Sequence, residues 1–191
     1  MAIKKPIQIT GNSTPIRQPG NLPVIRSGAW HSLPPFGATN NATVPDGRLF
    51  ALPFWPGRRC ALLGIAVNVT LAAVGGNLRM GLYTSANGLP LSLVREFGSM
   101  GVGVIGIQQF SGFSTHVEPD LYFLGICRQG GVLNLGLSTR DTWDPIISEL
   151  TPVIGSNLNS YYIDGVPGAF PALFGPPDGS VQGPSAAVQL T

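Results

Sequence analysis

The chain has 191 residues, of which 43% are apolar but only 10% are charged, and its formal net charge is +2. This length corresponds to one domain, and the small net charge argues against a nucleic-acid-binding surface. Soluble domains usually carry about 25% charged residues. The composition therefore favours a surface largely covered by other protein, and a surface rich in Ser, Thr, Asn and Gln is the alternative.

Residues 1–46 are predicted to form an extended, proline-rich N-terminal arm, either lying on a neighbour or wrapping the domain as a strand and loop. Prolines at positions 15, 19, 23, 34, 35 and 45 make a helix unfavourable there. The first residues contain lysines but no apolar signal-peptide core, and no run is long enough to span a membrane. We therefore expect synthesis in the cytoplasm without a signal for export.

Residues 47–191 are predicted to form an antiparallel, jelly-roll-like β-sandwich, which places the chain in the all-β class. Apolar and polar residues alternate along about seven runs separated by turn residues, as is typical of such folds. Asn87-Gly88 predicts a tight turn, and Gly81 would let a neighbouring side chain fit closely. We expect Arg79 and Arg95 to project to a polar face. The strand-like runs are 48–55, 59–71, 77–84, 91–100, 103–113, 121–129 and 131–139, with 185–191 as a further candidate.

The C-terminal third is predicted to be rich in loops. The run DPIISELTP at 144–152 is the best candidate for a short helix, with Asp144 as its N-cap. Residues 153–184 are rich in proline, and the rings of Tyr161, Tyr162, Phe170 and Phe174 are expected to pack over the sandwich. Both cysteines, Cys60 and Cys127, lie in apolar runs, which favours two reduced core thiols, although a disulfide between them is possible.

The sequence predicts no catalytic, cofactor-binding or metal site. The acidic pairs Glu118/Asp120 and Asp141/Asp144 have the spacing of turn and capping residues rather than of a hydrolase pair. The run HVEPD at 116–120 holds too few ligands for calcium or zinc. No nucleophile elbow or phosphate-binding glycine loop is present. We therefore expect a protein that is not an enzyme.

A few side chains are candidates for contact with a ligand or a partner. Trp143, Tyr161 and Tyr162, together with Tyr83, could form a platform on which a sugar stacks, or they could simply close the core. Asn87 is expected at an exposed hairpin tip, where it has no reactive group. The candidate contact residues are therefore Trp143, Tyr161, Tyr162 and Asn87.

Between residues 47 and 140 the chain resembles a β-sandwich module of virion proteins from tailed bacteriophages. The resemblance covers about half of the chain and rests on RLFALPFW, AAVGGNLRMGLY, NGLPLSLV and DLYFLGICRQG, which follow one another in this order. It implies a noncatalytic structural protein of the virion, assembled in the host cytoplasm, that attaches through its N-terminal arm and presents the sandwich outward.

The same resemblance implies the partners. These are other virion structural proteins and copies of the chain itself, with a homotrimer as the first expectation and without nucleic acid or membrane. A tail, fibre or adaptor position comes first. The alternatives are a capsid decoration (cement) protein, or a receptor-recognition module that binds a host surface glycan. The chain has no long fibre shaft or enzymatic spike domain, which puts cleavage of host polysaccharide in doubt.

Overall fold

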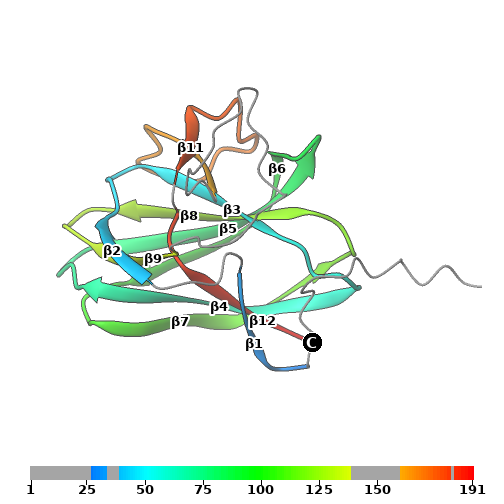
Figure 1. Ribbon diagram of the computed structural model, residues 1–191, viewed down its shortest axis with the longest axis horizontal. Helices are drawn as coiled ribbons and strands as arrows, with labels where there is room; N and C mark the ends of the chain where they lie inside the picture. Colours follow the sequence, from blue (N-terminus) through cyan, green and yellow to red (C-terminus); the bar gives the residue numbers. More distant parts are fainter. Residues whose placement is uncertain (1–26, 34–38, 139–159, 182) are drawn as a thin grey trace, which may run out of the picture.

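The computed structural model describes residues 27–33, 39–138, 160–181 and 183–191. In this part of the chain the secondary structure consists of strands and turns without a helix, and the strands form two sheets stacked as layers (Figure 1). Every pairing between named strands is antiparallel. The predicted all-β, antiparallel sandwich is confirmed.

The first sheet is the lower layer in Figure 1 and is organised around the long strand β4. Strand β7 pairs along nearly the whole length of β4, whereas β12 and β9 pair with different parts of it. Strand β1 extends the sheet beyond β12, and β2 extends it beyond β9. The bounds are β1 Trp30–Ser32, β2 Thr39–Thr43, β4 Cys60–Leu71, β7 Gly106–Val117, β9 Asn134–Ser138 and β12 Ala186–Leu190.

The second sheet has the strand order β11-β10-β3-β8-β5-β6, so β8 and β3 lie at its centre. Strand β6 is an edge strand, and its pairing with β5 is interrupted by register shifts. The bounds are β3 Leu49–Phe54, β5 Asn77–Ala86, β6 Leu89–Gly101, β8 Tyr122–Gln129, β10 Ser160–Ile163 and β11 Gly179–Val181.

The main core fills the space between the two sheets, and the predicted alternation accounts for it. From β4, Ile65 and Val69 are fully buried in this core, and from β5, Leu78 and Leu82 meet them from the other sheet. Val67 and Met80, which lie between these residues on the same faces, are buried in it as well. Because successive residues of a strand point to opposite faces, the period of two in the sequence placed the inward face of β4 and β5 correctly.

A second core lies on the outer face of the second sheet. The segment 164–178, here called the cover segment and coloured orange at the top of Figure 1, packs onto that face. This burial on both sides explains why all six residues of β3 are buried. The predicted packing of Tyr161, Phe170 and Phe174 over the sandwich is confirmed. The buried members are Leu49, Ala51, Tyr83, Phe123, Cys127, Tyr161, Val166, Phe170 and Phe174.

Two glycines form the floor on which Phe170 of the cover segment sits. Gly81 of β5 and Gly125 of β8 are cross-strand partners. A Cβ atom at Gly81 would lie 2.6 Å from Cδ2 of Phe170, and one at Gly125 would lie 2.9 Å from its Cε2. The predicted close approach at Gly81 is therefore confirmed, and its neighbour is an aromatic ring from 89 positions further along the chain.

The face of β5 that was predicted to be polar is not open to solvent. Arg79 shares it with Gly81 and Tyr83, and its side chain is only 23% exposed. The Arg79 guanidinium pairs with Glu96, whose other carboxylate oxygen accepts a hydrogen bond of 3.2 Å from the backbone N–H of Phe170. This ion pair is thus one of the anchors of the cover segment. Arg95 instead donates to the carbonyl of Ser114 in β7 at 3.0 Å.

The hairpin between β5 and β6 has the predicted turn. Asn87 and Gly88 both have positive φ, 53° and 78°, as a type I′ turn requires at its two central residues. Strand β7 differs from its prediction, because it continues from the expected end at residue 113 to Val117. Thr115 and Val117 are buried on one face and pair with the start of β4, so the chain turns only at residues 118–121.

Part of the segment predicted as an arm belongs to the sandwich. Strands β1 and β2 lie within residues 1–46 and pair with β12 and β9, so the sheets begin before residue 47. Residues 1–26 of the predicted arm lie outside the described residues, as does the helix candidate at 144–152. The predicted strand at the C-terminus is present as β12, and both cysteines are free and buried as predicted.

Candidate interaction surface

The aromatic residues predicted to contact a ligand lie in different surroundings. Trp143 lies outside the described residues. Tyr161 is only 4% exposed and belongs to the second core, where its ring lies 5.9 Å from that of Phe123. Asn87 is exposed at the tip of the β5–β6 hairpin.

Tyr162 is the partly exposed member of the predicted set. The Arg48 guanidinium lies 4.1 Å from the centre of its ring, in a cation–π contact. Its register partner on β11 is Gly179, where an added Cβ would lie 3.1 Å from the ring and from the hydroxyl oxygen of Tyr162. The ring is therefore engaged by its own chain and is not a free platform for a sugar.

Tyr83, the fourth ring considered for such a platform, is fully buried. Its hydroxyl donates to the carbonyl of Pro171 at 3.0 Å, and its ring meets that of Phe174 edge to face at 5.4 Å. Burial raises the pKa of the phenol well above its usual range. Tyr83 therefore anchors the cover segment, and together with Tyr161 it contributes to packing rather than to an open surface.

The carboxylates of the described residues are all held by arginines or backbone N–H groups. Asp164 pairs with Arg48 at 2.7 Å, and that hydrogen bond is the main reason why the pKa of Asp164 lies below its usual range. Glu118 pairs with Arg59 at 3.1 Å. Glu96 pairs with the guanidinium of Arg79. The other three carboxylates accept hydrogen bonds from backbone N–H groups: Asp46 from Gly130, Asp120 from Leu121, and Asp178 from Asp164.

These contacts are those of turns and loop anchors. Asp120 and Glu118 stabilise the turn between β7 and β8, as their spacing predicted. A search of the described part of the chain finds no group of three or more His, Cys, Asp or Glu residues close enough to hold a metal ion.

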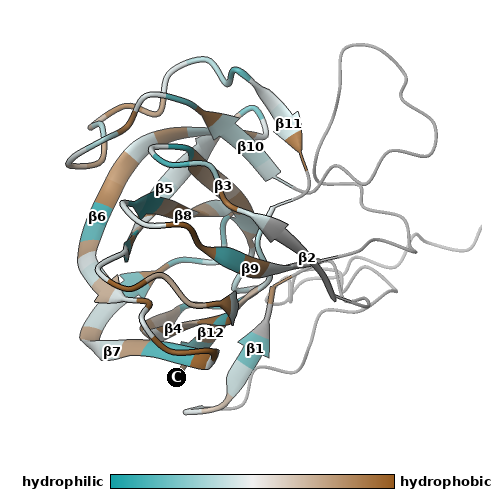
Figure 2. Cartoon of the chain, turned by 90° about the vertical axis from the view of Figure 1, so that its left-hand side faces the viewer, coloured by the Kyte–Doolittle hydropathy of each residue, from teal (hydrophilic) through white to brown (hydrophobic). Residues whose placement is uncertain are grey.

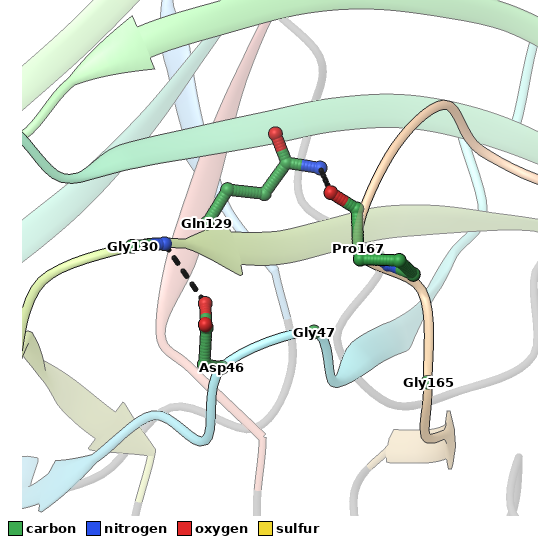
Figure 3. Close-up of a pocket in the computed structure, with 6 residues that line it drawn as sticks. All are labelled: Asp46, Gly47, Gln129, Gly130, Gly165 and Pro167. Atoms are coloured by element: carbon green, nitrogen blue, oxygen red, sulfur yellow. Dashed lines mark hydrogen bonds between the residues drawn. The ribbon is translucent and has the colours of Figure 1, made fainter.

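A cavity of about 260 Å³ lies between Asp46, the end of β8 and the cover segment (Figure 3). Its polar groups are already engaged. Asp46 accepts a hydrogen bond from the backbone N–H of Gly130 at 2.8 Å, and the amide of Gln129 donates to the carbonyl of Pro167 at 3.0 Å and to that of Gly168 at 2.8 Å. Asp46 is its one titratable lining residue. The cavity therefore lies between loops that these hydrogen bonds hold together, and its single carboxylate is engaged in one of them.

The most unusual surface lies at the end of the sandwich where β4 and β8 finish and β7 begins. We call it the neutral end: residues 71–76, 102–107 and 130–133. It is on the left in Figure 1, and Figure 2 views the molecule from this side, with hydrophobic loops in brown. Val102 and Leu133 of this end are buried, and six other aliphatic side chains are between 44% and 92% exposed; they are Leu71, Val74, Val104, Ile105, Ile107 and Val132.

The three loops of the neutral end are tied to one another. Ala73 donates its backbone N–H to the carbonyl of Val102 at 3.0 Å, and Val102 donates to the carbonyl of Gly76 at 3.1 Å. Gly131 packs so closely against Ala73 that an added Cβ would lie 2.8 Å from the Ala73 Cβ. The exposed side chains are therefore presented by a connected set of loops and not by separate, independent tips.

No charged residue lies in the parts of the chain that build this end. The sequence contains no Asp, Glu, Lys or Arg in residues 69–78, 98–115 or 129–139. The exposed fractions together equal about four fully exposed aliphatic side chains. Covering each would contribute about 1.5–3 kcal/mol. Exposed apolar patches of this kind mark sites of interaction.

Sequence reasoning missed the neutral end because it took AAVGG as a turn and assigned most of GVGVIG and GGVLN to the strand-like runs 103–113 and 131–139. The available signal was that all three combine glycine with aliphatic residues and lack charge. What the sequence could not supply was that the three loops, separated by about 25–30 residues each, meet at one place.

No protein-family model matches the chain, and a search of curated proteins found no relative. Within the residues that the structure describes, no helix is long and apolar enough to cross a membrane. The class that the fold and the surface define is a β-sandwich with an uncharged, aliphatic end exposed on the single chain.

Proposed function

We propose that this chain is a noncatalytic structural protein of a tailed-phage virion, in a tail, fibre or adaptor position. The single observation that carries the proposal is the neutral end, which is an exposed aliphatic surface without charge on a chain that is only 10% charged. A surface of this kind is costly to leave in water and favourable to cover with protein.

Two further observations agree with a structural role. The described carboxylates are committed to arginines or backbone groups, so their chemistry is that of anchors. The sandwich also has the order of sequence motifs that resembles a module of phage virion proteins. In this proposal the N-terminal segment attaches the protein to the particle, and the partners are other virion proteins and copies of the chain, in a homotrimer.

Quantitative mass spectrometry of gradient-purified particles, from the phage that carries this sequence, tests the proposal. The chain should be enriched in particles relative to the host lysate, in a copy number that is a small multiple of three. Immunogold labelling then distinguishes a tail or fibre position from decoration of the capsid. A chain that is abundant in the lysate and absent from the particles would refute a virion role.

A further inference from the structure

We infer that the neutral end is a self-association surface through which copies of this chain pack against one another. This inference deepens the proposed function, on which it rests for the premise that the chain works within an assembly, by naming the surface and its partner. The contact would join Val74, Val104, Ile105, Ile107 and Val132 of one copy to the same side chains of another.

The size of the patch fits an interface. The side chains expose the equivalent of about four full aliphatic side chains. At about 25 cal/mol per Å², this corresponds to roughly 240–480 Å² of apolar surface. A standard interface buries about 800 Å² per partner, of which somewhat more than half is apolar. The neutral end thus supplies the apolar part of one side of an ordinary interface.

The absence of charge identifies the kind of partner. A partner that brought acidic or basic groups, such as nucleic acid, a lipid headgroup surface or a charged protein, would lose their hydration without gaining an opposite charge. The three segments of a second neutral end bring no charged side chain to desolvate. The carboxylate of Asp46, which contacts this end through the backbone N–H of Gly130, is already paired there. A self-complementary patch is what a twofold contact between copies uses. Three copies that place their neutral ends around a threefold axis likewise bring equivalent side chains together.

The free edge of strand β7 also favours contact between copies at the neutral end. Among the described strands β7 pairs with β4 alone, so its other edge carries no neighbouring strand. At its far end this edge is covered by Arg95, which donates to the carbonyl of Ser114 and to the hydroxyl of Thr115. Of the described strands, β4 alone forms backbone pairs with residues 106–110, which begin within the neutral end. Open edges of this kind accept strands from another chain.

Sedimentation equilibrium of the full-length chain at micromolar concentration tests the inference with the variant Ile105→Glu. The wild-type chain should self-associate, and Ile105→Glu should weaken the association by at least about 100-fold, because a carboxylate would be buried at the contact without a partner. The matched control is Leu173→Glu. Leu173 is as exposed as Ile105, at 63%, but lies in the cover segment, so association should be unchanged.

If Ile105→Glu fails to fold by circular dichroism, Val74→Glu replaces it, since Val74 is 92% exposed on a loop. Identity of the partner is tested with Val74→Cys and a short bismaleimide, because both native thiols are buried. Covalent dimers of the chain should form with Val74→Cys and not with Leu173→Cys.

A monomeric wild-type chain, or a folded Glu variant that associates like wild type, would overturn the inference. These outcomes separate it from the proposed function. If the chain is found in particles but its neutral end does not self-associate, the proposed virion role stands and the inferred self-contact is wrong. If the chain associates through this end but is absent from particles, the self-contact stands and the proposed virion role is wrong.

Discussion

The ring of Phe170 packs directly against Gly81, 89 positions earlier in the chain. Substitutions at these two residues should therefore have coupled effects on the free energy of unfolding. The cover segment is held on the second sheet by this ring, which is 6% exposed and lies 6.2 Å from the ring of Tyr83. In Gly81→Ala the new methyl group would lie 2.6 Å and 2.8 Å from two carbons of Phe170, and 3.1 Å from the carbonyl oxygen of Arg95. The ring must move for the methyl group to fit.

The expected magnitudes follow from these distances. Gly81→Ala alone should lower the free energy of unfolding by about 1–3 kcal/mol, as overpacking of a core does. Phe170→Ala alone should cost about 3–5 kcal/mol, as loss of a buried ring does. In the double variant the ring is gone, and alanine is better than glycine in a strand by about 0.5–1 kcal/mol. The added methyl group should therefore leave stability unchanged or raise it by up to about 1 kcal/mol. The coupling energy should therefore exceed roughly 1 kcal/mol.

Urea denaturation of the four proteins in this cycle measures the coupling energy. Gly101→Ala is the matched control, since Gly101 is also in a strand but its nearest neighbour is 4.0 Å from an added Cβ. That variant should be as stable as the wild type or slightly more so. Additive costs for Gly81→Ala and Phe170→Ala, within about 0.3–0.5 kcal/mol, would refute the seating of the ring on this glycine.

Three further predictions concern charged and thiol groups. Arg48 lowers the pKa of Asp164, and this exposed ion pair should contribute roughly 0.2–1 kcal/mol to the free energy of unfolding. The contribution should be complete above the ordinary aspartate pKa of about 3.9 and should be lost as the pH falls through the lower pKa of the folded state. Asp164→Asn should remove this part of the pH dependence of urea unfolding. Burial raises the pKa of Cys127 to about 12 and also raises the pKa of Cys60. Both thiols should therefore resist Ellman's reagent at pH 8 until the chain is unfolded. Rapid labelling of the native protein would contradict their burial. Arg128 is 8% exposed, its Nε has no hydrogen-bond partner, and this atom lies 3.7 Å from the carboxylate of Asp46. Arg128→Met should therefore be neutral or stabilising by about 1–4 kcal/mol in thermal unfolding. Asp46→Ala should destabilise by about 1.5–3 kcal/mol, because it removes the partner of Arg128 and the acceptor of Gly130 N–H.

The parts of the fold that depend on local pattern were predictable from the sequence. The alternation in residues 59–71 and 77–84 gave β4, β5 and the inward face of each, because a strand directs successive side chains to opposite sides. Asn87-Gly88 gave the hairpin, because few residue pairs tolerate two positive φ angles. The close approach at Gly81 was also predictable, although the identity of Phe170 as the neighbour was not.

The parts that depend on tertiary contacts were not predictable. The run from residue 114 reads as a turn because residues 114–116 are polar, but pairing of residues 115–117 with Cys60, Ala61 and Leu62 keeps them extended. The outer face of β5 reads as solvent-facing because it carries Arg79, and only the cover segment makes it a second core. The neutral end is likewise built from three loops whose meeting is fixed by hydrogen bonds between distant segments.

The proposed virion role is the central claim, and cryo-electron microscopy of purified phage particles that contain this chain tests it most directly. Density for the sandwich should occur in symmetry-related copies, with Val74, Val104 and Ile105 of each copy in contact with the next and shielded from solvent. A particle without this density would contradict the virion role, and copies whose three residues all face water would contradict the neutral end as the surface that holds them together.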